Sequence, residues 1–294
     1  MKPLSKTEKH MRIGAHISSA GGISKAMARG TKIGCETIQF FGSSPQGWAF
    51  NRIPRKEIEA FRQAAAEEKI GPVFLHAIYL INLGTPNAAN VEKGIESLVS
   101  YMKLADSIGA TGVIFHPGSH GGRGYEAVLP QTVEAIKKVL DESPEGPVLA
   151  VENMAGMGQH IGAKFQELGG ILKSVDSPRV GICLDTQHSF AAGYDLASKK
   201  GIDDMIAEFD ETIRLEHLVA VHANDSKRPC GTGVDRHDNI GEGFIGQEGF
   251  ATIMGNYAFK DVPFFLEVPG FEGRGPDERN IPILKDIRAN GISA

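Results

Sequence analysis

Residues 181–195 read GICLDTQHSFAAGYD, and the fold can be worked out from this stretch. Gly181 to Leu184 form an apolar run that is typical of a short buried strand. The run ends at Asp185, and His188 follows three residues later. Because an unpaired charge beside a buried strand is costly, we expect both side chains to have a partner.

Apolar runs of this kind occur eight times along the chain. They are RIGAHI (12–17), TIQFF (37–41), PVFLHA (72–77), GVIFHP (112–117), PVLAVEN (147–153), GICLD (181–185), LVAVH (218–222) and PFFLEV (263–268). Amphipathic stretches with helical spacing lie between them, as at 55–69, 91–109 and 127–143. Eight apolar strands separated by crossover helices predict a parallel sheet buried on both faces, and 294 residues suit a (β/α)8 barrel of α/β class.

A doubly wound open sheet is the alternative architecture. The first run continues as AHISSAGG (15–22), without the GxGxxG loop of a dinucleotide-binding fold, which disfavours that alternative. No linker or repeat divides the chain, so we expect one domain over 11–294 after a flexible extension at 1–10. The polar, glycine-rich stretch 223–262 reads as one long loop, and such loops are usually functional.

Composition limits the class of protein. The net charge of −5 argues against a protein that coats nucleic acid through bulk charge, but it leaves room for a locally positive groove. Cys35, Cys183 and Cys230 form no CxxC pair, which favours a reducing compartment. No signal peptide and no run near the roughly 20 apolar residues of a membrane span is visible. We expect a cytoplasmic protein without a membrane partner.

Six of the eight runs end in a histidine or a carboxylate. In a barrel these ends face one rim, where active sites are built. Imidazole and carboxylate are ligands of zinc and related divalent ions, and a cation offsets the repulsion between carboxylates. One such histidine is more often a hydrogen-bonded core residue, but six at one rim predict a metal site. The six are His76, His116, Glu152, Asp185, His222 and Glu267.

Three further residues can reach the same rim. His188 would do so from the loop after Asp185. Asp235 and His237 are separated by one residue, so in an extended segment they would point to the same side. Nine ligand-type residues are too many for one ion. They imply two or three metals, an arrangement typical of phosphoryl-group hydrolysis.

The remaining histidines are expected to play other parts. His16 and His120 lie at or near strand ends, where they would orient ligands through hydrogen bonds. His10, His160 and His217 are expected to be structural or exposed.

Several motifs resemble, in order, those of the endonuclease IV family of abasic-site DNA repair enzymes. The motifs are HAIYLINLGTP (76–86), FHPGSH (115–120), AVENMAGMG (150–158), GICLDTQHSFAAGYD (181–195), HANDSK (222–227), DRHDNIGEG (235–243) and LEVPGFEGRGPD (266–277). The likeness runs from about residue 12 to 288. It implies a (β/α)8 barrel of the xylose-isomerase-like kind with three zinc ions. Because histidine and carboxylate also bind manganese, this ion is an alternative at one or more positions.

The resemblance also assigns ligands to each ion. The first would be held by His76, His116 and Glu152. The second would share Glu152 and be held also by Asp185, His222 and Glu267. The third would be held by His188, Asp235 and His237. Asp185 and His188 would therefore serve different ions.

The implied activity is hydrolysis of the phosphodiester 5′ to an abasic site in duplex DNA, a step of base excision repair. Glu152, Asp185 and Glu267 would be the catalytic carboxylates, and Glu152 would position the nucleophile. Family members flip the damaged nucleotide into the pocket, which costs least where no base pair is broken. Tyr79 and Leu80 match residues that enter the base stack. We expect a monomer that needs no protein partner.

One motif departs from the family pattern. Typical members often carry an arginine two residues before the tryptophan of the second-strand loop, whereas SSPQGW (43–48) has Gln46 before Trp48. Gln46 and Trp48 are still expected to contact DNA. Phosphate contacts would then depend more on other cations. The candidates are Lys227, Arg228, Arg236 and Arg274.

Two other functions compete with this one. A sugar isomerase or epimerase on a related barrel would bind one or two divalent ions, but it would need neither the DRH segment nor an intercalating Tyr79–Leu80 pair. A metal-stabilised module that binds abasic sites without cutting is the second. Nine ligands argue against it, because structural zinc sites are usually closed, four-coordinate and rich in thiolate.

Overall fold

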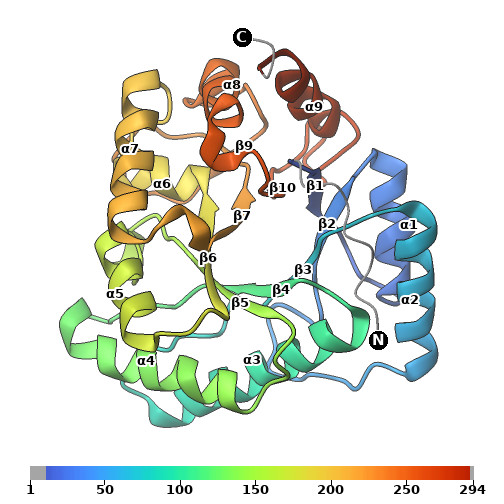
Figure 1. Ribbon diagram of the computed structural model, residues 1–294, viewed down its shortest axis with the longest axis vertical. Helices are drawn as coiled ribbons and strands as arrows, with labels where there is room; N and C mark the ends of the chain where they lie inside the picture. The colour runs from blue at the N-terminus through green and yellow to red at the C-terminus, as the bar shows by residue number, and fades with distance from the viewer. Residues whose placement is uncertain (1–10, 292–294) are drawn as a thin grey trace.

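Eight parallel strands close into a barrel in the computed structural model, which describes residues 11–291 (Figure 1). β1 pairs with both β2 and β10, and these two pairings close the sheet. The strands are β1 (Ile13–His16), β2 (Thr37–Phe41), β3 (Val73–His76), β4 (Gly112–Phe115), β5 (Val148–Glu152), β6 (Val180–Asp185), β7 (Leu218–His222) and β10 (Phe264–Leu266). All eight predicted strands are confirmed. The predicted N-terminal extension at 1–10 lies outside the described residues.

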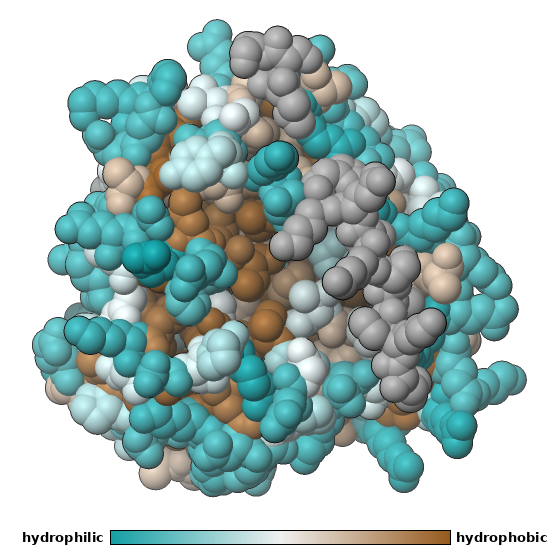
Figure 2. All heavy atoms as spheres, viewed as in Figure 1, coloured by the Kyte–Doolittle hydropathy of each residue, from teal (hydrophilic) through white to brown (hydrophobic). Residues whose placement is uncertain are grey.

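Apolar residues fill the centre of the face seen in Figure 2, and hydrophilic residues cover its periphery. Helices surround the barrel (Figure 1). They are α1 (Ser24–Ile33), α2 (Arg55–Glu68), α3 (Ala88–Ile108), α4 (Tyr125–Asp141), α5 (Phe165–Val175), α6 (Thr186–Ala192), α7 (Lys199–Thr212), α8 (Gly246–Gly255) and α9 (Asn280–Gly291), with the short 3-10 turns η1 (Met157–Gln159), η2 (Leu215–His217) and η3 (Tyr257–Phe259). The helices expected at 55–69, 91–109 and 127–143 are α2, α3 and α4. Within residues 11–291, no helix combines the length and apolarity needed to cross a bilayer.

The inside of the barrel is packed with apolar side chains. Six buried residues form a cluster separate from the main core between sheet and helices. The rings of Phe74 and Phe265 meet there edge to face, with centroids 5.6 Å apart. This cluster forms a solid floor, as expected for a barrel of this size. Its members are Phe74, Ile114, Ala150, Cys183, Ala220 and Phe265.

The floor explains why polar residues gather above it. Alternate side chains of a strand point to the same face, so the residue two positions after each floor residue also points inward. That step leads to the six strand-end residues His76, His116, Glu152, Asp185, His222 and Glu267. The same step from Gly14 of β1 and Thr37 of β2 leads to His16 and Gln39. Each of the eight strands therefore places one inward polar residue at or near its carboxyl end, at one rim.

The prediction of one long loop over 223–262 is wrong. The segment contains an antiparallel hairpin of β8 (Asp225–Ser226) and β9 (His237–Asp238), followed by α8 and η3. The sequence GQEGFATIMG of α8 looks like a loop because of its three glycines. Phe250, Ile253 and Met254 nevertheless follow helical spacing, and all three are buried, so packing of this stripe stabilises the helix.

Candidate metal centre

Glu152 lies at the centre of the predicted ligands and is fully buried. Its Oε2 atom lies 3.2 Å from Nε2 of His76 and 3.1 Å from Nε2 of His116. Its Oε1 atom lies 3.0 Å from Nδ1 of His222 and 3.3 Å from Nδ1 of His188. One carboxylate from β5 thus joins four histidines that come from four other parts of the chain.

The other carboxylates extend this centre on both sides. Nδ1 of His222 lies 3.4 Å from Glu267 and 3.8 Å from Asp185. Asp235 lies 3.4 Å from Nε2 of His188 and 3.3 Å from Nε2 of His237. All nine residues selected from the sequence therefore meet at the carboxyl end of the barrel.

Three groups within this centre have ligand atoms close enough to share an ion. One is His76, His116 and Glu152, and another is Glu152, Asp185, His222 and Glu267. The third is Asp185, His188 and His237, with Asp235 beside both histidines. Asp185 thus belongs to two groups, one of which includes His188. That Asp185 and His188 serve different ions stays a prediction.

His188 reaches the rim from a helix, whereas we expected a loop. Asp185 is the N-cap of α6, and its Oδ1 atom accepts a hydrogen bond from the backbone amide of His188 at 2.8 Å. An aspartate at this position satisfies a free amide of the first helical turn. The cap therefore fixes the two side chains relative to each other.

The β8–β9 hairpin delivers the last two residues. His237 pairs with Ser226 in this hairpin, and Asp235 lies two positions earlier. Side chains two apart in an extended segment share a face, so both meet His188. Arg236 points the other way and lines a different cavity together with Lys227.

Hydrogen bonds orient four of the imidazole rings. A carbonyl oxygen only accepts, so each Nδ1 that contacts one must carry the proton. This applies to His76 with the Ala77 carbonyl at 2.7 Å, His188 with the Asn153 carbonyl at 2.8 Å and His237 with the Glu267 carbonyl at 3.2 Å. In His222 the roles are reversed, because Nε2 donates to the Gln39 amide oxygen at 2.8 Å. The other ring nitrogen of all four then faces carboxylates.

This donor set fits divalent metal ions. A ring nitrogen without a proton and a carboxylate oxygen are both acceptors, so only a proton or a cation between them makes the contact favourable. Nε2 of His237 is buried and has no hydrogen-bond partner within residues 11–291. Ligand atoms of a tetrahedral zinc site lie roughly 3.4 Å apart, given bonds of about 2.1 Å. The nitrogen–oxygen distances of 3.0–3.8 Å bracket that value.

The charges of the centre shift the pKa values of its members. Burial alone would raise the pKa of Glu152, but His222 and His116 outweigh it and hold that pKa well below its ordinary value. Burial would likewise lower the pKa of His188, but Asp185 and the other carboxylates beside it raise that pKa well above its ordinary value. Positive charge is therefore strongly favoured between these groups.

Sequence reasoning missed Gln39, whose amide lies inside the same rim. Its Nε2 group donates to Oε1 of Glu267 at 2.7 Å and lies 2.9 Å from Nδ1 of His16, while its oxygen accepts from His222. A glutamine inside the apolar run TIQFF was the available signal. A buried amide in such a strand needs hydrogen-bond partners.

Two asparagines that sequence reasoning also missed hold Asp185. The Asn153 side chain accepts from the Asp185 amide at 2.6 Å, and the Asn224 side chain donates to Oδ2 of Asp185 at 2.7 Å. The Asn224 oxygen also accepts from the Glu267 amide at 2.8 Å. Each asparagine follows a strand end within two residues, which was the signal in the sequence.

The remaining histidines differ from one another. His16 lies 3.1 Å from Oε1 of Glu267, as expected of a residue that orients a ligand. For His120 that expectation is wrong, because its Nδ1 atom accepts from the Gly124 amide at the start of α4. His160 lines the cavity above the centre, together with Tyr79 and His116.

The residues predicted to contact DNA differ in exposure and line different cavities. Tyr79 and Leu80 are exposed at the mouth, where 55% and 39% of their surface is accessible. Gln46 is exposed, but Trp48 packs partly against the main core. The cations lie in two separate places. Lys227, Arg228 and Arg236 line one cavity, and Arg274 lines another.

A closed (β/α)8 barrel with histidines and carboxylates gathered at one rim defines a broad class of metal-binding TIM barrels. Residues 27–287 match the family described as xylose isomerase-like TIM barrel. A solved D-tagatose 3-epimerase-like protein superimposes with a TM-score of 0.74 at 17% identity, a likeness that shows the fold alone. Endonuclease IV from Thermus thermophilus superimposes with a TM-score of 0.83 at 33% identity, covering 95% of this chain and 99% of that one.

Full-length relatives narrow the class to one family. A probable endonuclease 4 from Halothermothrix orenii is 41% identical over 276 residues, which cover 94% of this chain and 99% of the relative. A probable endonuclease 4 from Aquifex aeolicus is 36% identical and covers 94% and 98%. The chain belongs to the endonuclease 4 family.

Proposed function

We propose that the protein is a metal-dependent endonuclease that hydrolyses the phosphodiester 5′ to an abasic site in duplex DNA. The products would be a 3′-hydroxyl and a 5′-deoxyribose phosphate, as in base excision repair. The observation that carries the proposal is the convergence of nine histidine and carboxylate side chains below an open cavity, in a chain of the endonuclease 4 family.

We assign the three groups of the centre to three zinc ions, with manganese as the alternative at one or more positions. When bound, such ions activate water and neutralise charge on the phosphate and the departing oxygen. Glu152 would position the nucleophile, because it joins the first group to the second and contacts four histidines, whereas Asp185 joins the second group to the third. Asp185 and Glu267 complete the catalytic carboxylates.

The surrounding residues keep these carboxylates in place. Asn153 and Asn224 hold Asp185 from two sides, and Gln39 holds Glu267. Because amides cannot ionise, they fix the carboxylates without adding charge to the centre. The geometry is therefore set before substrate arrives, which lowers the reorganisation needed during the reaction.

The cavity above the centre suits a nucleotide turned out of the helix. It has a volume of about 370 Å³, and its walls include Tyr79, His116, His188 and Glu267. Tyr79 and Leu80 present exposed apolar surface at its edge, where they would occupy the gap left in the base stack. A sugar isomerase has no need of such exposed residues.

The proposal extends to the oligomeric state and the domain organisation of the protein. All nine candidate ligands come from one chain, so a monomer would suffice. We propose that the chain from residue 11 onward acts as one domain, because the ligands come from strands distributed around the whole barrel.

A labelled duplex with one tetrahydrofuran abasic analogue tests the function, because this analogue lacks the aldehyde that lyase chemistry needs. We expect metal-loaded protein to make a single nick on the 5′ side with a 3′-hydroxyl, read by mass. Exhaustive chelation should abolish the nick, and added zinc should restore it. An undamaged duplex is the control. An intact abasic duplex together with epimerisation of a ketohexose would refute the proposal in favour of a sugar epimerase.

A further inference from the structure

A second groove opens beside the mouth of the barrel. Its volume is about 640 Å³, and it lies between the segment after β1, helix α1, the segment after β2 and the loop at 274–276. His16 is one of its lining residues, and this histidine contacts Glu267 of the metal centre. The groove therefore leads directly from the proposed reaction site.

The charged side chains that line this groove are all positive. Arg29 and Arg274 line it, and no carboxylate is among the described residues that do so. Arg29 donates to the carbonyl oxygens of Ser18 at 2.6 Å and Ala20 at 2.7 Å. Carbonyl groups are neutral, so these bonds orient the guanidinium without cancelling its charge. Arg274 is exposed and has no hydrogen-bond or ion-pair partner within residues 11–291.

The loop that carries Arg274 is well organised. The Gly275 amide donates to the Pro269 carbonyl at 2.7 Å, and the Gly273 amide donates to the Gly270 carbonyl at 3.0 Å. A side chain at Gly270 would lie 1.9 Å from the Gly275 carbonyl oxygen, so only glycine fits there. The turn thus holds the Arg274 backbone at the groove.

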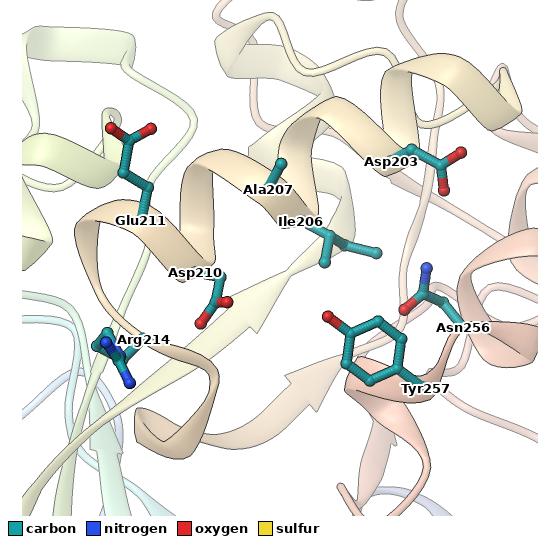
Figure 3. Close-up of a pocket in the computed structure, with 8 residues that line it drawn as sticks. All are labelled: Asp203, Ile206, Ala207, Asp210, Glu211, Arg214, Asn256 and Tyr257. Carbon is teal, nitrogen blue, oxygen red and sulfur yellow. The ribbon is translucent and has the colours of Figure 1, made fainter.

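Two other surface cavities have a different charge. The cavity in Figure 3 is lined by Asp203, Asp210 and Glu211 with a single cation, Arg214. Arg214 precedes η2 and β7, so it lies at the amino end of the barrel, opposite the mouth. The cavity beside the β8–β9 hairpin has three cations, Lys227, Arg228 and Arg236, but also Asp238 and Glu242. Both would attract a polyanion less strongly than the groove.

We propose that Arg29 and Arg274 bind a backbone phosphodiester of the DNA strand that carries the abasic site. This inference rests on the proposed function for the identity of its ligand. Phe41 lines the groove, and its ring lies 4.3 Å from that of His16 and 5.3 Å from that of Tyr79. A strand with one nucleotide below Tyr79 would therefore continue past Phe41 into the groove. The two arginines there would supply the positive charge that typical family members often carry as an arginine at the position of Gln46.

The salt dependence of DNA binding tests the inference. We compare Arg274→Gln with Arg214→Gln, which removes the same charge at the opposite end of the barrel. The probe is a duplex with one tetrahydrofuran analogue and a neutral methylphosphonate at the 5′ linkage, which resists cleavage. Each phosphate contact contributes about one to the slope of log K against log salt. We expect R274Q to reduce the slope by about one and R214Q to leave it unchanged. Equal slopes for R274Q and the unmodified protein would overturn the inference.

A methylphosphonate scan locates the contact. One neutral linkage at a time is placed on either side of the abasic analogue. We expect one position at which the neutral linkage weakens binding by the unmodified protein several-fold but leaves R274Q unaffected. If no position behaves in this way, Arg274 contributes only general charge and the inference is wrong. Arg29→Lys keeps the charge and serves as the second variant, because Arg29→Gln would also disturb the loop after β1.

The two proposals fail in different ways. If the metal-loaded protein nicks abasic DNA but R274Q has an unchanged slope, only the groove assignment is lost. The opposite outcome is also distinct. If the protein does not nick abasic DNA, but R274Q still reduces the salt slope and the methylphosphonate scan still finds one contacted phosphate, the groove assignment stands and the proposed hydrolysis is wrong.

Discussion

Gln39 shows how one neutral residue can organise a charged centre. Its amide donates to Glu267 and accepts from His222, so it joins β2 to β10 and β7. Replacement by leucine would keep much of the volume but leave both partners free to turn. Replacing a residue that orients metal ligands typically weakens metal affinity roughly 10- to 100-fold. We therefore expect Q39L to bind zinc about 10- to 100-fold more weakly, measured by competition with a chromogenic chelator.

Gln63 supplies the matched control for this change. Its side chain is exposed on α2 and donates to Glu67, one turn along the same helix. Q63L should leave zinc affinity unchanged. Equal zinc affinity in Q39L and the unmodified protein would show that Gln39 does not position these ligands.

The nine candidate ligands could be selected from the sequence, whereas the signal at Gln39, a polar residue inside an apolar run, was weak. A histidine or carboxylate at the end of an apolar run is visible in the sequence because its chemistry differs from that of the run. Gln39 is followed by two further apolar residues, so it looks like an ordinary interruption of a strand. Its importance depends on which face it occupies, and this became clear only when the floor residues identified the inward positions.

At the scale of elements, Asp225 organises the hairpin that carries Asp235 and His237. Its buried carboxylate accepts hydrogen bonds from five backbone amides, those of Ser226, Gly241, Gly243, Ile245 and Gly246. Asparagine at this position would direct an NH2 group toward amide donors. Hydrogen bonds to a charged group contribute about 1.5–3 kcal/mol, so we expect D225N to lose at least about 2 kcal/mol of unfolding free energy. Urea denaturation measures this loss.

Occupancy of the proposed third metal site should fall in the same variant. The hairpin is short, so disorder of the loop at 239–246 would displace Asp235 and His237 from His188. Metal analysis of purified D225N should find fewer ions per chain than in the unmodified protein. Asp261→Asn, on an exposed turn, is the control. Full metal content with unchanged stability would contradict this account.

Element prediction from the sequence worked best where one pattern dominated. The strands were visible as apolar runs, and the long helices had clear helical spacing. Helix α8 and the β8–β9 hairpin were not visible, because each depends on distant contacts. Asp225 stabilises the two-residue strands by accepting hydrogen bonds from amides of the loop that follows them, and the apolar stripe of α8 packs against the core.

At the scale of the whole molecule, α9 fastens the last part of the barrel to the first. Arg288 of α9 donates to the Met11 carbonyl at 2.8 Å and to both oxygens of Glu36, at 2.7 and 2.9 Å. Glu36 also accepts from the Ile13 amide at 3.0 Å, at the start of β1. The sequence indicated the barrel but not this link, since the two residues are separated by nearly the whole chain.

This link makes a prediction about acid stability. Burial alone would raise the pKa of Glu36, but Arg288 and the Ile13 amide outweigh it and lower that pKa from 4.5 to about 2. A carboxylate with a lowered pKa in the folded state stabilises the protein fully above its unfolded pKa, and this stabilisation is lost as the pH falls through the folded value. Partial exposure of both side chains reduces the contribution to about 1–2 kcal/mol. We expect E36Q to be less stable than the unmodified protein by that amount at pH 7.

The difference should shrink below pH 4.5, become small near pH 2 and vanish below it, where Glu36 is mostly protonated in the folded unmodified protein as well. Urea unfolding at a series of pH values measures it. Glu145→Gln, on the exposed segment after α4, should match the unmodified protein throughout. A difference between E36Q and the unmodified protein that persisted unchanged at low pH would mean that Glu36 acts through packing and not through its charge.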